Sequence, residues 1–119
     1  MDTLKKHIYI AGPYTAETEV NLYKNIEKAE QAAAEIFHIG HIPIVPHITG
    51  FSLSCDEKHA DHPHEHWMQN LCLPLLSKCD AIYMLKDWQN SKGALIEHDY
   101  ARQKGIPIFF QEEGGICPF

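Results

Sequence analysis

Four short apolar segments alternate with longer helical segments along this chain, and that alternation constrains the fold most. Strands are predicted at residues 8–11, 42–46, 81–85 and 106–110, and helices at 20–39, 66–78 and 94–104. Strands that alternate with helices form parallel sheets through right-handed crossovers. The sequence therefore predicts a doubly wound α/β fold of the Rossmann or flavodoxin type, a mostly parallel sheet with helices on both faces.

Turn and breaker residues mark the ends of several segments. Gly40 is expected to close the first helix and Gly105 the last. The prolines within 42–46 suggest that this strand lies at an edge of the sheet, and Pro74 predicts a kink or break in the second helix. Residues 47–63 are expected to form a long polar connection.

Length and charge limit the kinds of function. A chain of 119 residues suits one domain, 1–119, and its net charge of −6 argues against a nucleic acid polymer as partner. No apolar run is long enough to span a membrane and no signal peptide is evident, so we expect a cytoplasmic protein. Four cysteines without paired spacing, Cys55, Cys72, Cys79 and Cys117, favour reduced thiols. No cofactor and no metal is expected.

Three loops should leave the carboxyl edge of the predicted sheet, where such folds bind their ligands. They comprise residues 12–21, 47–63 and 86–91. We therefore expect these loops to converge on one pocket.

The last of these loops leads into a helix start that suits an anion. Ser91 is a good N-cap, and Gly93 lets a ligand approach the free N–H groups of the first turn, where the helix dipole favours negative charge. Glu97 follows Gly93 by four residues and so lies on the same helix face, about 5.4 Å further along the axis. This spacing predicts a phosphate site with a carboxylate beside it.

Three segments together resemble the nucleoside 2-deoxyribosyltransferase superfamily, which includes 2′-deoxynucleoside 5′-phosphate N-hydrolases. They are Ile-Tyr-Ile-Ala-Gly-Pro at 8–13, Cys-Asp-Ala at 79–81, and the Ser-x-Gly-Ala-x-x-Glu motif at 91–97. The resemblance implies an enzyme that hydrolyses or transfers the base of a (deoxy)nucleoside 5′-monophosphate. It also implies a homodimer or a higher homo-oligomer.

Residue roles follow from that resemblance. Glu97 would attack the anomeric carbon and form a covalent glycosyl-glutamate intermediate, and Tyr9 would hold the glutamate in place. Ser91 and Gly93 would bind the 5′-phosphate. The residues expected to bind substrate are Gly12, Tyr14, His47, Asp87, Trp88, Ser91, Gly93 and Ala94.

For three of these residues a second reading stays open. Tyr14 and Trp88 could stack on a base, or each could pack as an aromatic lid over loop atoms. Asp87 could reach the sugar hydroxyls or be solvated.

The chain departs from the superfamily at the acid that assists departure of the base. An aspartate is usual eight residues before the Asp80 position, and here that residue is Cys72, with Leu71 and Asn70 beside it. Other groups that could donate the proton are His47, His66 and Asp61.

Two alternative functions remain. The loss of the acid would suit a nucleotide-binding module with weak or no catalysis. Alternatively, the loop from His59 to His66, with Cys55 before it, could hold a metal ion for a hydrolase, although its spacing matches no established zinc pattern.

Overall fold

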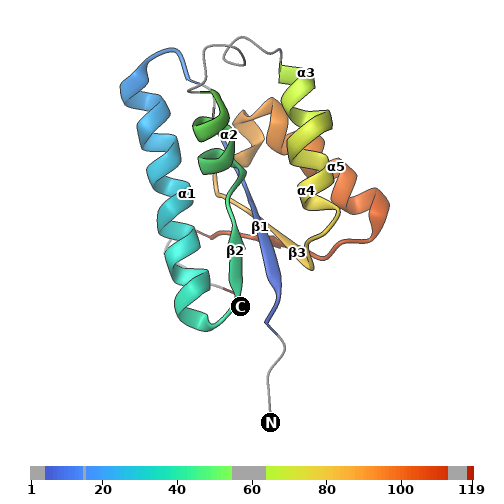
Figure 1. Ribbon diagram of the computed structural model, residues 1–119. Coiled ribbons are helices and arrows are strands. Elements are labelled where there is room, and N and C mark those ends of the chain that lie inside the picture. Colours follow the sequence, from blue (N-terminus) through green and yellow to red (C-terminus); the bar gives the residue numbers. More distant parts are fainter. Residues whose placement is uncertain (1–4, 15, 55–63, 113–117) are drawn as a thin grey trace.

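The protein is described by a computed structural model that covers residues 5–14, 16–54, 64–112 and 118–119. Four parallel strands form one sheet in the order β2-β1-β3-β4 (Figure 1). The strands are β1 (His7–Ala11), β2 (Ile42–Ile44), β3 (Ala81–Met84) and β4 (Ile108–Phe110). The predicted α/β fold is confirmed, and β2 does lie at an edge.

Helices cover both faces of this sheet (Figure 1). Helix α1 (Glu19–Ile39) packs on one face against Ile8 and Ile10 of β1. Helix α5 (Lys92–Lys104) packs on the other face, which receives Tyr9 and Ala11, because successive side chains of a strand point to opposite sides. Among the described helices none is long and apolar enough to cross a membrane.

The ends of α1 and α5 are fixed by local signals that the sequence contains. Thr18 and Ser91 cap their N-termini through side-chain oxygens that accept from backbone N–H groups. Gly40 and Gly105 end them in the left-handed conformation, with φ of 110° and 73°. Both predicted glycine stops are confirmed.

The prediction of a polar connection from residue 47 is wrong in its first half. Residues Pro46–Ser54 form helix α2, whose first turn is closed by Ile48 and Thr49 donating to the carbonyl oxygen of Val45. Proline is favoured at the first helical position, because its φ already suits a helix and it has no N–H to leave unpaired. Pro46 therefore starts this helix and does not end the preceding strand. Residues 55–63 lie outside the described part.

The second predicted helix is present and is interrupted where Pro74 requires it. It consists of α3 (His64–Trp67), the π-helical turn η1 (Met68–Cys72) and α4 (Leu73–Leu76). A proline inside a helix lacks an N–H and its ring clashes with the carbonyl four residues earlier. The wider π turn, in which Leu73 donates to the carbonyl of Met68, is found where this clash would otherwise occur.

The direction in which successive strands are added to the sheet reverses at β1. The chain moves from β1 to β2 on one side through α1, and then passes beyond β1 to β3 on the other side. Ligands in such sheets bind where the strand order reverses, at the carboxyl ends of the strands. Here that place lies between Gly12 after β1 and Leu85 after β3.

Gly12 is the point at which these two strand ends touch. A Cβ atom at Gly12 would lie 2.6 Å from Cδ1 and 2.9 Å from Cβ of Leu85, too close for any side chain. We expect Gly12→Ala to lower the free energy of unfolding by about 1–3 kcal/mol through overpacking, measured by urea denaturation. Leu85→Ala should cancel part of this loss in the double variant. If the losses of unfolding free energy in the two single variants simply added in the double variant, the result would contradict the contact.

Candidate active site

Tyr9 and Glu97 form a buried pair between β1 and α5. Tyr9 is fully buried in the middle of β1, and Glu97 is 5% exposed in the second turn of α5. The Tyr9 hydroxyl donates a hydrogen bond to Oε2 of Glu97, although 88 residues separate the two in sequence. The residues proposed as nucleophile and positioning group are therefore in direct contact.

Burial changes the acidity of both members of the pair. It raises the pKa of Glu97 to about 8, and the hydrogen bond from Tyr9 opposes this shift without cancelling it. The pKa of Tyr9 is raised well above its usual value, first by burial and then by the nearby charge of Glu97. Tyr9 thus keeps its proton at neutral pH, whereas Glu97 gains and loses its proton at a pH close to neutral.

Cys72 adjoins this pair from the end of η1. Its thiol lies near the Tyr9 hydroxyl and interacts electrostatically with Glu97. Burial, together with the Glu97 charge, raises the pKa of Cys72 to about 11. The position expected to carry an acid thus lies beside the candidate nucleophile, but its thiol holds its proton too tightly to be an effective acid.

The start of α5 has the predicted form. Oγ of Ser91 accepts from the backbone N–H of Ala94 at 3.1 Å, and the carbonyl of Ser91 accepts from Leu95 at 3.0 Å. Ala94 is buried and its N–H is used in the cap. The first N–H groups of a helix have no partner within it, and those of Lys92 and Gly93 are the groups at this helix start that could bind an anion.

Trp88 packs inside an aromatic cluster. Its ring stacks on His98 with centroids 4.7 Å apart and planes 20° from parallel, and it also contacts Phe110. One face of the indole is therefore covered by His98 of α5.

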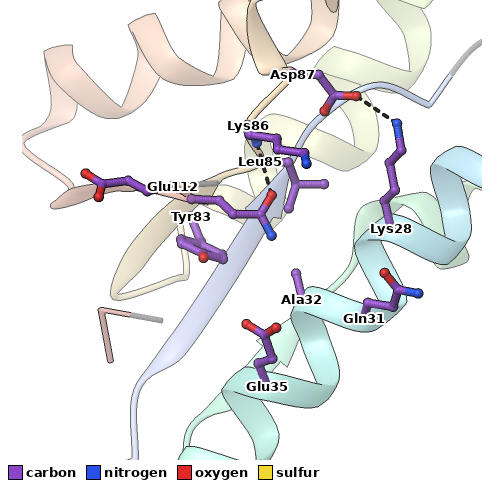
Figure 2. A pocket seen from close by; sticks show the side chains of 10 residues that line it. Lys28, Gln31, Ala32, Glu35, Tyr83, Leu85, Lys86, Asp87 and Glu112 are labelled. Carbon is purple, nitrogen blue, oxygen red and sulfur yellow. Dashed lines mark hydrogen bonds and ion pairs between the residues drawn. The ribbon is translucent and has the colours of Figure 1, made fainter. Parts of the chain in front are cut away.

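Asp87 lies on the other face of the sheet from Glu97. One of its carboxylate oxygens accepts from Lys28 of α1 at 3.1 Å (Figure 2). Asp87 and Lys28 line a cavity of about 380 Å³ whose floor includes Tyr83 and Leu85, two residues of the α1-side core. Nothing in the sequence pattern indicated that Lys28 would take part.

His47, the first residue of the second predicted loop, contacts the first predicted loop, residues 12–21. Its Nε2 lies 3.1 Å from the carbonyl oxygens of both Gly12 and Pro13, and the rings of His47 and Tyr14 form a T-shaped pair with centroids 5.9 Å apart. Carbonyl oxygens only accept, so Nε2 carries the hydrogen and is already committed. Burial also lowers the pKa of His47, which does not suit a proton donor.

The two remaining candidates for the acid are His66 and Asp61. His66 in α3 is hydrogen-bonded to the side chain of Asn70, one turn along the same helical run. Asp61 lies outside the described residues, as do Cys55, His59 and His62 of the histidine loop. Within the described ranges no three histidine, cysteine or acidic side chains gather closely enough to hold a metal ion.

Comparison with known proteins places the chain in a family. No curated protein matches it. The sequence matches the family described as a domain of unknown function, DUF4406, over residues 6–110. The matched region runs from β1 to the end of β4 and includes Tyr9, Cys72 and Glu97. This chain belongs to the DUF4406 family.

Proposed function

We propose that the protein is an N-glycosidase that cleaves, or transfers, the base of a (deoxy)nucleoside 5′-monophosphate. The observation that carries this proposal is the buried Tyr9–Glu97 pair next to the point where the strand order reverses. The motif from Ser91 to Glu97, which resembles that of the nucleoside 2-deoxyribosyltransferase superfamily, supports the same activity.

The pair suits attack on an anomeric carbon. Cleavage of a glycosidic bond passes through an oxocarbenium-like state that a carboxylate can trap. The ionised Glu97 would form an ester to C1′ as the C1′–N bond breaks, and water or an acceptor base would then release the sugar. Tyr9 fixes the reacting carboxylate by its hydrogen bond, since its own burial prevents it from ionising.

A second candidate function is a nucleotide-binding module with little or no turnover. The specific observation in its favour is Cys72, a thiol with a pKa of about 11 where an acid is expected. The departing base would then have to take its proton from another group. Binding of nucleotides without release of base would favour this candidate.

The proposal is tested by base release. Purified protein is incubated with a panel of deoxyribonucleoside and ribonucleoside 5′-monophosphates and with the matching nucleosides, and free base is measured by liquid chromatography. We expect release from at least one monophosphate and much weaker release from its nucleoside. No release from any monophosphate would overturn the proposed activity.

Ser91→Ala should weaken phosphate capture without removing the nucleophile. We expect KM for the monophosphate to rise roughly tenfold with little change in kcat, because the lost contact is made in the ground state and in the transition state alike. The lost cap should also lower the free energy of unfolding by about 1 kcal/mol.

The matched control is Thr18→Ala, which removes the corresponding cap of α1. It should cost similar stability and leave KM unchanged. Equal KM values for the Ser91 variant and the wild type would remove Ser91 from the phosphate site.

The metal-dependent hydrolase remains a separate prediction, because most of the histidine loop lies outside the described residues. A strong chelator distinguishes it from the glycosidase. Base release that survives the chelator would exclude the metal-dependent reading. We also propose, from the resemblance, that the protein forms a homo-oligomer, which sedimentation analysis would test.

A further inference from the structure

An aromatic cluster joins the loop before α5 to the body of that helix. Trp88, the first residue of the short helix η2 (Trp88–Asn90), stacks on His98 with ring centroids 4.7 Å apart and planes 20° from parallel. Phe110, the last residue of β4, contacts both rings, with centroid distances of 5.8 Å to Trp88 and 6.0 Å to His98. One residue of the loop, one of α5 and one of β4 therefore meet in this cluster.

His98 lies on the side of α5 that begins at Ser91. The two residues are seven apart, so they differ by about two turns, or about 10.5 Å along the axis, and lie on nearly the same side of the helix. Glu97 is one residue earlier and so about 100° around the helix. Trp88 therefore lies along the side of α5 that carries Ser91, away from the side that carries the candidate nucleophile.

The backbone between Trp88 and the helix is a continuous series of tight turns. The N–H of Trp88 donates to the carbonyl of Leu85 at 2.9 Å, and the N–H of Ser91 donates to the carbonyl of Trp88 at 3.0 Å. The carbonyl of Ser91 in turn accepts from the N–H of Leu95 in the first turn of α5. Because Trp88 is hydrogen-bonded to the N-cap residue, a contact that fixes Trp88 also fixes the helix start.

Consecutive residues fasten this loop to the helices on the two faces of the sheet. Asp87 pairs with Lys28 of α1 on one face (Figure 2), and Trp88 stacks on His98 of α5 on the other. The Lys28 side chain is 52% exposed, and ion pairs in contact with solvent contribute little to stability. Stacked aromatic rings contribute more, because they also remove apolar surface from water. The Trp88–His98 stack is therefore the stronger of the two attachments.

We propose that His98 is a positioning residue for the phosphate site, because it holds Trp88 and, through Trp88, the N-cap residue Ser91. That the ligand is a 5′-phosphate rests on the proposed function, whereas the fixing of the loop by the stack does not. A loop that moved freely would have to be ordered when the anion binds, and the entropy lost would weaken binding. His98 thus increases affinity for the phosphate without contacting it.

Hydrogen exchange tests the fixing of the loop in the protein without ligand. In His98→Ala the backbone amides of Trp88 and Ser91 should exchange about three- to tenfold faster than in the wild type, because opening of the loop no longer breaks the stack. His98→Phe keeps a flat ring on the helix and should restore slow exchange. The matched control is His38→Ala, since His38 contacts Phe37 at the exposed end of α1, and it should change neither amide.

Binding of 2′-deoxyadenosine 5′-monophosphate tests the consequence for the site. Calorimetry is carried out with all variants in the Glu97→Gln background, which prevents turnover. We expect Kd to rise about three- to tenfold for His98→Ala, to return for His98→Phe and to stay unchanged for His38→Ala. His98→Ala should weaken binding less when Ser91→Ala is already present, because both changes act on the same phosphate contact.

The outcomes separate this proposal from the proposed function. Monophosphate binding that depends jointly on His98 and Ser91, without any release of base by the wild type, would support the positioning role and count against the glycosidase. Unchanged exchange or unchanged Kd in His98→Ala would overturn the role even if base is released. So would full additivity with Ser91→Ala, a loss that His98→Phe does not restore, or failure of the monophosphate to bind.

Discussion

Glu97→Gln should abolish base release while leaving nucleotide binding almost intact. Glutamine has nearly the same shape and can still accept from the Tyr9 hydroxyl, but its amide cannot form the glycosyl ester. We expect kcat to fall at least roughly a thousandfold, as for the loss of other covalent nucleophiles, with Kd for a monophosphate within about threefold of wild type. Single-turnover assays and calorimetry measure the two quantities.

The control for this variant is Asp99→Asn on the same helix. Asp99 is exposed and pairs with Arg102 one turn further along α5, so its loss removes a charge from the helix but not from the site. Wild-type turnover is expected for it. A Glu97→Gln enzyme that turns over at the wild-type rate would mean that Glu97 is not the nucleophile, whatever the substrate panel shows.

Glu97 should also make the protein less stable as the pH rises. Its pKa is about 8 in the folded protein and near 4.5 when unfolded, so the folded state binds its proton more tightly. The contribution of Glu97 to stability is then greatest below pH 4.5 and falls as the pH rises to about 8, by about 3–5 kcal/mol at 1.36 kcal/mol per pKa unit. Such a change is large for a domain whose total stability is about 5–15 kcal/mol.

Glu97→Gln isolates this contribution from the other titrating groups. The variant should be close to wild type in urea denaturation at pH 5 and clearly more stable at pH 8.5, because its neutral amide carries no charge to bury. With a saturating monophosphate added, the variant should still be the more stable of the two proteins at pH 8.5. A constant difference between wild type and variant across this pH range would contradict the raised pKa.

Much of the fold was predictable because its signals are local. A glycine in the left-handed conformation and a serine or threonine cap act on their own helix end, and these fixed α1 and α5 within a residue or two. Helix α2 was missed because Pro46 suits both the end of a strand and the start of a helix. Only contacts outside the segment decide between them.

In the candidate site, too, features within one segment were predictable and contacts between segments were not. The cap at Ser91 and the carboxylate of Glu97 could be read from one short segment, whereas the pairing with Tyr9 was suggested only by resemblance. The side of the sheet that Asp87 takes could not be predicted, because β3 ends at Met84 and Asp87 lies in the turn after it, where side chains no longer alternate. The ion pair of Asp87 with Lys28 could not be predicted either, since nothing in either segment specifies the other.

The π turn at Met68–Cys72 has a consequence for how this chain tolerates insertions and deletions. A π turn is equivalent to an α-helix with one extra residue, so deleting one residue there would restore a regular helix. The segment before the deletion would then rotate by about 100° relative to Cys72. A one-residue change in length would therefore change how α3 is placed relative to Cys72, the residue beside Tyr9 and Glu97.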